Sequence, residues 1–303
     1  MYDYDYDLLA DALTGDGITV LRNEPLSVHS SFRIGGTCAL AVFPADTESL
    51  LHAYERLTAA AVPIFLAGNG TNLLFPDGGF PGAVVFTEKM NRIAFCDGYV
   101  TAQAGASLTG LCAQAGKKRG YAGFSFGYGI PGSVGGGVYM NAGAYGGEMK
   151  DVLTVVRYLT AEGEVVQASA AELDLSYRHS IFEENGGCIL SAQFALQPGN
   201  AADIRAKMDE LMAKRVDKQP LDKPSAGSTF KRPAGAFAAA LIDQCGLRGY
   251  RHGGAAVSDK HCGFVVNLGG ATCADVLALC DEVRAIVKEK TGYELEKEIR
   301  VVK

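Results

Sequence analysis

The sequence feature that most constrains the fold is a glycine-rich stretch from Gly123 to Gly147, in which ten of 25 residues are glycine. Each glycine in an ordinary helix or strand costs about 0.5–1 kcal/mol of extra backbone entropy, so this density argues against both. Glycine turns let backbone approach a ligand, and successive N–H groups can line a concave anion site. Apolar residues interleave the glycines, as they would not in a flexible linker. We therefore expect a packed loop in which Ser133 and several free amides of residues 130–136 face a pyrophosphate.

Three of these glycines, Gly127, Gly129 and Gly132, match the dinucleotide-binding pattern G-x-G-x-x-G. The pattern identifies a nucleotide site only where a strand leads in and a helix follows at once. The residues that follow, at 135–137 and 141–143, are mostly glycine and are poor helix formers. We therefore reject a Rossmann interpretation of this match.

Composition indicates a globular protein of two or three domains, since the 303 residues are 48% hydrophobic and 20% charged. The net charge of -6 gives no basic footprint, which excludes nucleic acid as a partner. No apolar run reaches the roughly 18 residues of a membrane span, and the acidic N-terminus lacks the features of a signal peptide. The eight cysteines have no zinc-ligand spacing, so we expect buried thiols in a reducing cytoplasm.

The first 90 residues have the pattern of a small α/β lobe. Its expected elements are a helix at 8–13, a strand at 39–43, a helix at 47–60 capped by Thr47, and strands at 63–66 and 84–87. A second glycine-rich turn, residues 68–74, follows the strand at 63–66. Its Asn and Thr side chains either bind a ligand or bond only their own turn, and this stretch alone favours neither interpretation.

Residues 91–198 predict a second lobe, and residues 199–303 predict a third. The second lobe has expected strands at 99–103, 152–160, 165–168 and 188–196, and a helix at 107–119 that Gly120 ends. The third begins with a helix at 201–216 capped by Asn200, followed by helices at 235–245 and 274–290 and strands at 263–267 and 292–301.

Three residues are candidates for chemistry, and each has a plain structural alternative. Arg178 could be one half of a surface ion pair, Ser228 a turn residue, and Glu298 a charge that protects an edge strand. Lys231 and Arg232, two adjacent cations, indicate an anionic ligand near Ser228. The sequence has no H-E-x-x-H, which excludes the zinc proteases that use it. Spacing alone therefore leads to a protein of α/β lobes that binds a phosphate ligand.

Five motifs, in this order, closely resemble the UDP-N-acetylenolpyruvoylglucosamine reductase (MurB) family, in its shorter, type II branch. They are GNGTNLL at 68–74, GIPGSVGGGVYMNAGAYGGEM at 129–149, YRHSIF at 177–182, AGSTFKRP at 226–233 and LEKEIR at 295–300. The resemblance covers residues 27–303 and implies an α+β chain. Residues 1–90 and 91–198 would form a two-lobed FAD-binding fold of the vanillyl-alcohol oxidase (PCMH) type, and residues 199–303 a C-terminal α/β substrate-binding domain.

The resemblance implies an NADPH-dependent reduction of UDP-N-acetylglucosamine enolpyruvate to UDP-N-acetylmuramate, a peptidoglycan precursor, and hence a role in cell wall synthesis, cell shape and cell division. NADPH gives a hydride to non-covalent FAD, and the reduced flavin passes it to the vinyl carbon distal to the carboxylate. By position, Ser228 is the proton donor, and Arg178 and Glu298 lie at the carboxylate of the enol intermediate. The family also implies a cytoplasmic monomer without a metal.

The same resemblance assigns the binding residues. The expected substrate contacts are Tyr177, Arg178, Lys231 and Arg232. The expected FAD contacts lie in the two glycine-rich turns and are Gly68, Asn69, Gly70, Thr71, Asn72, Leu73, Gly132, Ser133, Gly136, Asn141 and Gly143.

Two positions depart from the family pattern. Arg232 stands where much of the family has Asn, which leaves the uridine-phosphate contact there open, and Lys297 stands where Pro is common. Register still favours Glu298 over Glu296 as the family's acidic residue. Two rival functions are another flavin enzyme of the same superfamily and a non-catalytic sensor of a nucleotide-sugar. The substrate-lobe motifs argue against the first, and the joint presence of Ser228, Arg178 and Glu298 argues against the second.

Overall fold

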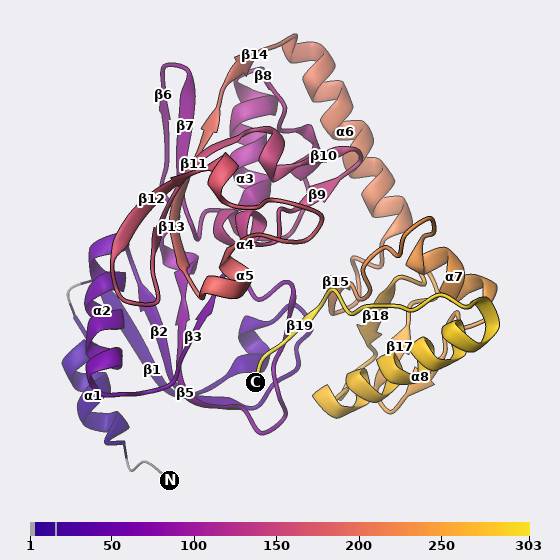
Figure 1. Cartoon of the computed structure of the whole chain (residues 1–303), viewed down its shortest axis with the longest axis horizontal. Coiled ribbons are helices and arrows are strands. Elements are labelled where there is room, and N and C mark those ends of the chain that lie inside the picture. The colour runs from indigo at the N-terminus through magenta and orange to yellow at the C-terminus, as the bar shows by residue number, and fades with distance from the viewer. Residues whose placement is uncertain (1–3, 16) are drawn as a thin grey trace. The chain divides into compact units, whose positions relative to one another are not determined.

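The computed structural model describes residues 4–15 and 17–303 and divides them into two compact units (Figure 1). The first unit takes in Met1–Arg22, Ala39–Asn69 and Gly82–Arg215, as far as these are described. The second takes in Asn23–Cys38, Gly70–Pro81 and Val216–Lys303. Both units mix helices with sheets. The division into three lobes at residues 90 and 198 stays a prediction.

The first sheet has the strand order β1-β2-β5-β3. Its strands are β1 (Ile18–Pro25), β2 (Thr37–Pro44), β5 (Phe80–Phe86) and β3 (Ile64–Ala67), of which β3 and β5 are parallel. Helices α1 (Tyr6–Leu13) and α2 (Thr47–Ala59) bury Leu13 and Leu57 in a core shared with Leu40. The glycine-rich turn at 68–74 leaves this sheet directly after β3.

The second sheet is antiparallel throughout and has the order β12-β11-β13-β7-β6. Its strands are β6 (Ile93–Cys96), β7 (Tyr99–Gln103), β11 (Leu153–Leu159), β12 (Val165–Ser169) and β13 (Cys188–Ala195). Helices α3 (Leu108–Cys112) and α4 (Val134–Tyr139) share one core with it, to which Leu108, Val138 and Phe194 contribute. A π-helical segment, Ala113–Lys118, continues α3, so the expected helix is confirmed nearly to its predicted end.

Short elements complete the first unit. They are β8 (Tyr121–Ala122) paired with β14 (Gln197–Pro198), β9 (Gly143–Ala144) paired with β10 (Gly147–Glu148), and helix α5 (Phe182–Asn185). Helix α6 (Ala201–Lys218) follows, and the boundary between the units falls within it. Asn200 is its cap, as predicted, since its Oδ1 accepts a hydrogen bond of 2.9 Å from the Ala202 amide.

The second unit is built on a sheet of order β15-β18-β17-β16, along which α8 lies (Figure 1). Its elements are β15 (Ser225–Ser228), β16 (Arg251–His252), β17 (Ala255–Val257), β18 (Phe264–Asn267), α7 (Ala238–Gln244) and α8 (Cys273–Thr291). Val276 and Val283 of α8 are fully buried in one core with Val257 and Val265 of the sheet. A parallel pair of short strands, β4 (Leu73–Leu74) and β19 (Arg300–Val301), joins the glycine-rich turn at 68–74 to the end of the chain.

The structure corrects two predicted helix starts. Asp46, not Thr47, caps α2, because its Oδ1 accepts from the Ser49 amide at 3.0 Å and Ser49 Oγ completes a capping box. Helix α7 starts at Ala238 and not at residue 235, because Gly235 has a φ of +75° and belongs to the turn before it.

Two strand predictions also need correction. The expected strand at 292–301 is reduced to Arg300–Val301, because the residues before it make single backbone contacts, such as the bridge between Phe230 and Lys297, and no continuous ladder. Strand β1 was not predicted, because most of its residues are exposed or half-buried and it lacks a regular apolar alternation.

All eight cysteines are thiols and form no disulfide in the described part of the chain, and Cys96 is exposed, contrary to the expectation that every cysteine is buried. Among the described residues, no helix combines the length and the apolar character that crossing a membrane requires.

Candidate active site

The two glycine-rich turns meet in the first unit at Gly68 and Ser133. A Cβ added to Gly68 would lie 2.4 Å from Ser133 Oγ, closer than any side chain tolerates. Ser133 is 1% exposed, and its hydroxyl caps α4 by accepting a hydrogen bond of 3.2 Å from the Gly136 amide. Gly136 itself is exposed. The pair therefore forms a close-packed cradle with an open glycine surface beside it.

Most backbone amides at the start of α4 are already used within the protein. The Val134 amide donates to Ala106 O and the Gly135 amide to Ala104 O, both at 2.8 Å. Gly135 has no room for a side chain, because an added Cβ would lie 2.9 Å from Ala104 Cβ. The expected row of free amides is therefore wrong at these positions, and so is the expectation that no helix forms here. Glycine is needed because α4 approaches the end of β7 so closely.

The rest of the glycine-rich turn at 68–74, from Gly70 on, lies in the second unit. Gly70 has a φ of +61°, and an added Cβ would lie 2.0 Å from His29 O, so only glycine fits there. Asn69 is exposed and Thr71 is half-buried. The Asn72 amide group donates to Glu298 O at 3.2 Å, so this side chain bonds a distant segment and not its own turn.

Ser228 and Glu298 are brought together by backbone hydrogen bonds in the second unit. The Glu298 amide donates to Thr229 O at 2.8 Å, and Thr229 Oγ1 accepts from the Val265 amide at 2.8 Å. Strand β15 carries a bulge between Ser225 and Ser228, within which Gly227 has a φ of +75°. Bulges of this kind bend a strand and redirect the side chain that follows. The fold thus holds the backbone of Glu298 against that of Thr229, the residue directly after Ser228.

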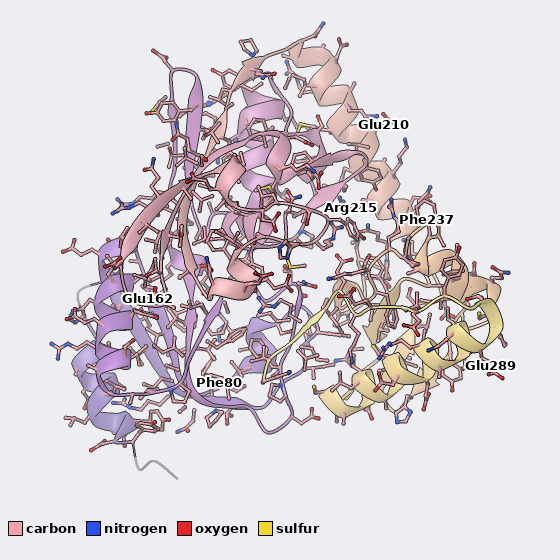
Figure 2. All side chains as sticks on the ribbon, in the orientation of Figure 1. Phe80, Glu162, Glu210, Arg215, Phe237 and Glu289 are labelled. Carbon is pink, nitrogen blue, oxygen red and sulfur yellow. The ribbon has the colours of Figure 1, made fainter. Side chains whose placement is uncertain are left out.

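The two cations after Ser228 have different surroundings. Lys231 Nζ lies 2.8 Å from Glu296 Oε1. Arg232 is exposed, and its Cζ lies 4.5 Å from the centre of the Phe237 ring, which is 60% exposed. Figure 2 labels Phe237 where it precedes α7. A guanidinium stacked on an exposed ring is held in place while it stays accessible to an anion.

Arg178 lies in a tight turn of the first unit, closed by reciprocal backbone hydrogen bonds of 3.3 Å between Ser176 and His179. Its φ of +56° is unusual for a residue with a side chain, and turns normally place Gly or Asn there. Arg178 Nη2 donates to Gly143 O at 3.2 Å, and its Cζ lies 5.0 Å from the Tyr177 ring centre. A strained arginine in a turn position favours a functional role over a surface ion pair.

Asn141 joins this turn to the glycine-rich loop. It is fully buried, and its Nδ2 donates to Glu148 Oε2 at 2.8 Å and to Ser176 O at 2.9 Å. Its Oδ1 accepts from the Lys150 amide at 3.0 Å. The side chain is therefore occupied by protein partners and shapes the loop, while its contact with FAD stays a prediction. Gly143 is equally constrained, because an added Cβ would lie 2.8 Å from Gly147 O.

Arg215 is a candidate that sequence reasoning missed (Figure 2). It lies near the end of α6 and is only 6% exposed, and burial lowers its pKa. Its Cδ and Nε would lie 3.1 Å from a Cβ added to Gly129, and its Cζ is 5.6 Å from the Tyr145 ring centre. Helical spacing from Leu211 places Arg215 on the inward face, a signal that could have found it. A buried cation beside the glycine-rich loop favours an anionic ligand there.

The structure thus gathers the site residues in two groups. Arg178, Ser133 and the 129–143 loop belong to the first unit, and Ser228, Lys231 and Glu298 belong to the second. Within residues 4–15 and 17–303, no cluster of three or more histidine, cysteine, aspartate or glutamate side chains could hold a metal ion.

Two protein families match the sequence. Residues 38–169 match the FAD binding domain family, and residues 219–302 match the C-terminal domain family of UDP-N-acetylenolpyruvoylglucosamine reductase. The UDP-N-acetylenolpyruvoylglucosamine reductase of Lachnoclostridium phytofermentans is 49% identical over 288 residues, covering 93% of both chains. The protein of the same name from Levilactobacillus brevis is 42% identical over 296 residues, covering 97% of both.

Solved structures agree with these matches. The crystal structure of UDP-N-acetylenolpyruvylglucosamine reductase from Thermus caldophilus superposes with a TM-score of 0.79 at 32% identity, covering 94% of this chain and 99% of that one. Berberine bridge enzyme from Eschscholzia californica shares the fold at 17% identity, with a TM-score of 0.50 over 65% of this chain and 44% of its own. The expected fold, an FAD-binding part of the oxidase type followed by a distinct C-terminal domain, is confirmed.

Proposed function

The chain belongs to the UDP-N-acetylenolpyruvoylglucosamine reductase family, and we propose that it reduces UDP-N-acetylglucosamine enolpyruvate to UDP-N-acetylmuramate with NADPH as the hydride donor. The observation that carries this proposal is the hydrogen bond from the Glu298 amide to Thr229 O. It holds two family motifs, AGSTFKRP and LEKEIR, side by side. The proton donor and the acidic residue assigned by resemblance are thereby neighbours in the fold.

The first unit has a cradle that fits FAD. The approach of Gly68 to Ser133 excludes a side chain there, the exposed Gly136 offers open backbone, and Arg215 supplies a buried positive charge nearby. We assign FAD contacts to the two glycine-rich turns, with Gly68, Asn69, Gly70, Thr71, Asn72, Leu73, Gly132, Ser133, Gly136 and Gly143 as the residues, and Asn141 in support. Neither turn contains a histidine, so the cofactor is non-covalent.

The protein's own residues handle the carboxylate and the proton. When bound, FAD supplies the hydride relay from NADPH to the vinyl carbon distal to the substrate's carboxylate. The planar guanidinium of Arg178 binds the carboxylate as a fork and stabilises the enolate charge that develops on it. Glu298 lies at the same carboxylate. A serine hydroxyl is a weak acid, but the carbanion character of the enolate makes it a strong enough base to take the proton of Ser228. Proton transfer to the carbon that bears the carboxylate completes the product.

Three further side chains serve the nucleotide-sugar. Tyr177, Lys231 and Arg232 are the proposed contacts. Lys231 and Arg232 provide positive charge for the diphosphate, and the stacking of Arg232 on Phe237 holds its guanidinium in place. We further propose that the protein acts as a cytoplasmic monomer in cell wall synthesis, and so contributes to cell shape and division.

The purified protein should be yellow, and acid precipitation should release the flavin into the supernatant because no covalent bond holds it. NADPH should bleach the yellow colour in the absence of oxygen. A protein that is colourless and takes up no FAD on reconstitution would contradict the proposed function.

Gly68→Ala should weaken FAD binding and lower the unfolding free energy. The new methyl group would force Ser133 Oγ away from the Gly136 amide, and loss of a helix cap costs about 1 kcal/mol. Urea unfolding and FAD titration measure the two effects. Gly78→Ala is the matched control, because an added Cβ there meets nothing within 4 Å. Equal FAD affinity and equal unfolding free energy in the two variants would show that the close approach of Gly68 to Ser133 does not contribute to FAD binding.

A further inference from the structure

The turn that presents Arg178 is part of a strained assembly. Seven non-glycine residues of the described chain have a positive φ, and four of them lie in two loops of the first unit: Asn141, Tyr145, Asp174 and Arg178. Hydrogen bonds from Asn141 to Ser176 O and from Arg178 to Gly143 O join these loops. Such backbone conformations persist only where the surrounding structure imposes them. Some contact must therefore hold the Arg178 turn closed.

His179 makes that contact, directly after Arg178. Its Nε2 lies 3.3 Å from Asp174 Oδ2, and its Nδ1 lies 3.2 Å from Glu183 Oε2. Asp174 precedes the turn, and Glu183 follows it in α5. A neutral imidazole has one N–H and can donate to only one of these carboxylates, whereas an imidazolium donates to both.

We propose that His179 is a positioning residue for Arg178, an imidazolium clamp between Asp174 and Glu183 that fixes the strained turn and so aims the guanidinium at the substrate's carboxylate. The inference rests on the proposed function, in which Arg178 binds that carboxylate. Two other side chains anchor the same loops, since Asn141 donates to Ser176 O and Ser180 to Tyr139 O. Both are neutral groups, and the carboxylate beside them, Glu148, accepts from Asn141 and lies 2.7 Å from Lys150 Nζ. Histidine is the side chain whose usual pKa lies nearest neutrality, so the His179 clamp is the part of the assembly that responds to pH there.

The direction of the pH effect follows from the clamp. The hydrogen bond with Glu183 raises the pKa of His179 above its usual 6.5, with a further contribution from Asp174 and partial opposition from burial. Because the pKa is raised in the folded state, the clamp is complete below pH 6.5 and is lost as the pH rises through the folded-state value.

The test follows the clamp by NMR and the reaction by stopped flow. The His179 ring signal should titrate with a raised pKa, and the Arg178 Nε–H signal should broaden over the same pH range. Single-turnover product formation by the reduced holoenzyme should slow over that range, while reduction by NADPH should not. Glu183→Gln should move all three transitions to lower pH. His179→Gln should abolish the transition and slow product formation about tenfold at low pH, which is about 1.4 kcal/mol.

His252→Gln is the matched control, because His252 pairs with a single carboxylate, Glu282, at 2.8 Å in the second unit. It should leave the pH profile unchanged. An Arg178 signal that is indifferent to His179 titration, or a transition that stays in place in Glu183→Gln, would overturn the clamp. Failure of NADPH to reduce the wild-type holoenzyme would instead overturn the proposed function, and the two NMR signals would still decide whether the clamp exists.

Discussion

Ser228→Ala should reduce its bound FAD with NADPH at the wild-type rate, yet form UDP-N-acetylmuramate more slowly by a factor on the order of 10² or more. The hydroxyl donates a proton to the substrate-derived enolate, and that step has no counterpart in the oxidation of NADPH. The bulge at Gly227 and the contact between Thr229 and Glu298 fix the position from which Ser228 acts. Anaerobic stopped flow separates the two half-reactions, because the flavin colour is lost in the first and returns in the second.

Two further variants make this result interpretable. Ser228→Cys should recover part of the rate, since a thiol can also donate a proton. Ser225→Ala is the control on the same strand and should be close to wild type in both halves, because the hydrogen bonds of Ser225 with Ser31 and its strand pairing with Val266 are made by its backbone, which the substitution keeps. Equal slowing of both halves in Ser228→Ala would mean that Ser228 shapes the pocket and supplies no proton.

Arg178→Lys should keep FAD content normal and still lower kcat/KM for UDP-N-acetylglucosamine enolpyruvate by about 10- to 100-fold. Lysine keeps the charge but loses the planar fork, and hydrogen bonds to charged groups contribute about 1.5–3 kcal/mol. Arg178→Ala should lose more. Steady-state kinetics and flavin absorbance measure the two quantities. Wild-type rates in both variants would show that Arg178 is a surface residue that takes no part in the reaction.

A third substitution at this position separates function from stability. Arg178→Gly removes the guanidinium but relieves the φ of +56°, whose cost to a residue with a Cβ is about 1–2 kcal/mol. The greater backbone entropy of glycine in the unfolded state offsets about 0.5–1 kcal/mol of this gain in folding free energy. Arg178→Gly should therefore be about as stable as the wild type in urea and inactive toward substrate. Strong destabilisation would show that Arg178 is needed mainly to hold the turn.

The sequence was most informative where local chemistry decides structure. The Asn200 cap, the strand at 99–103 and the helix at 274–290 followed from capping and periodicity, and the structure confirms them within a residue or two. Resemblance supplied what periodicity could not, namely the family and the assignment of Ser228 and Glu298 to one site. The contact between Thr229, beside Ser228, and Glu298 depends on a backbone hydrogen bond between segments about 70 residues apart, which no local pattern encodes.

The failures have physical causes in tertiary packing. Helix α4 forms in spite of its glycines because close approach to Ala104 excludes larger residues, so packing overrides helix propensity. Arg215 was overlooked because a charged residue near the end of a helix is usually solvated, whereas its place against Gly129 buries it. The role of His179 could not be found from the sequence, because the carboxylates that hold it belong to a turn and a short helix.

The central claim is tested most directly by one turnover of the wild-type protein. The holoenzyme is reduced with one equivalent of NADPH without oxygen, separated from NADP, and mixed with UDP-N-acetylglucosamine enolpyruvate. We expect the flavin colour to return as UDP-N-acetylmuramate forms, with one product molecule for each flavin reoxidised. A reduced flavin that persists in the presence of this substrate, or colour that returns without UDP-N-acetylmuramate, would contradict it.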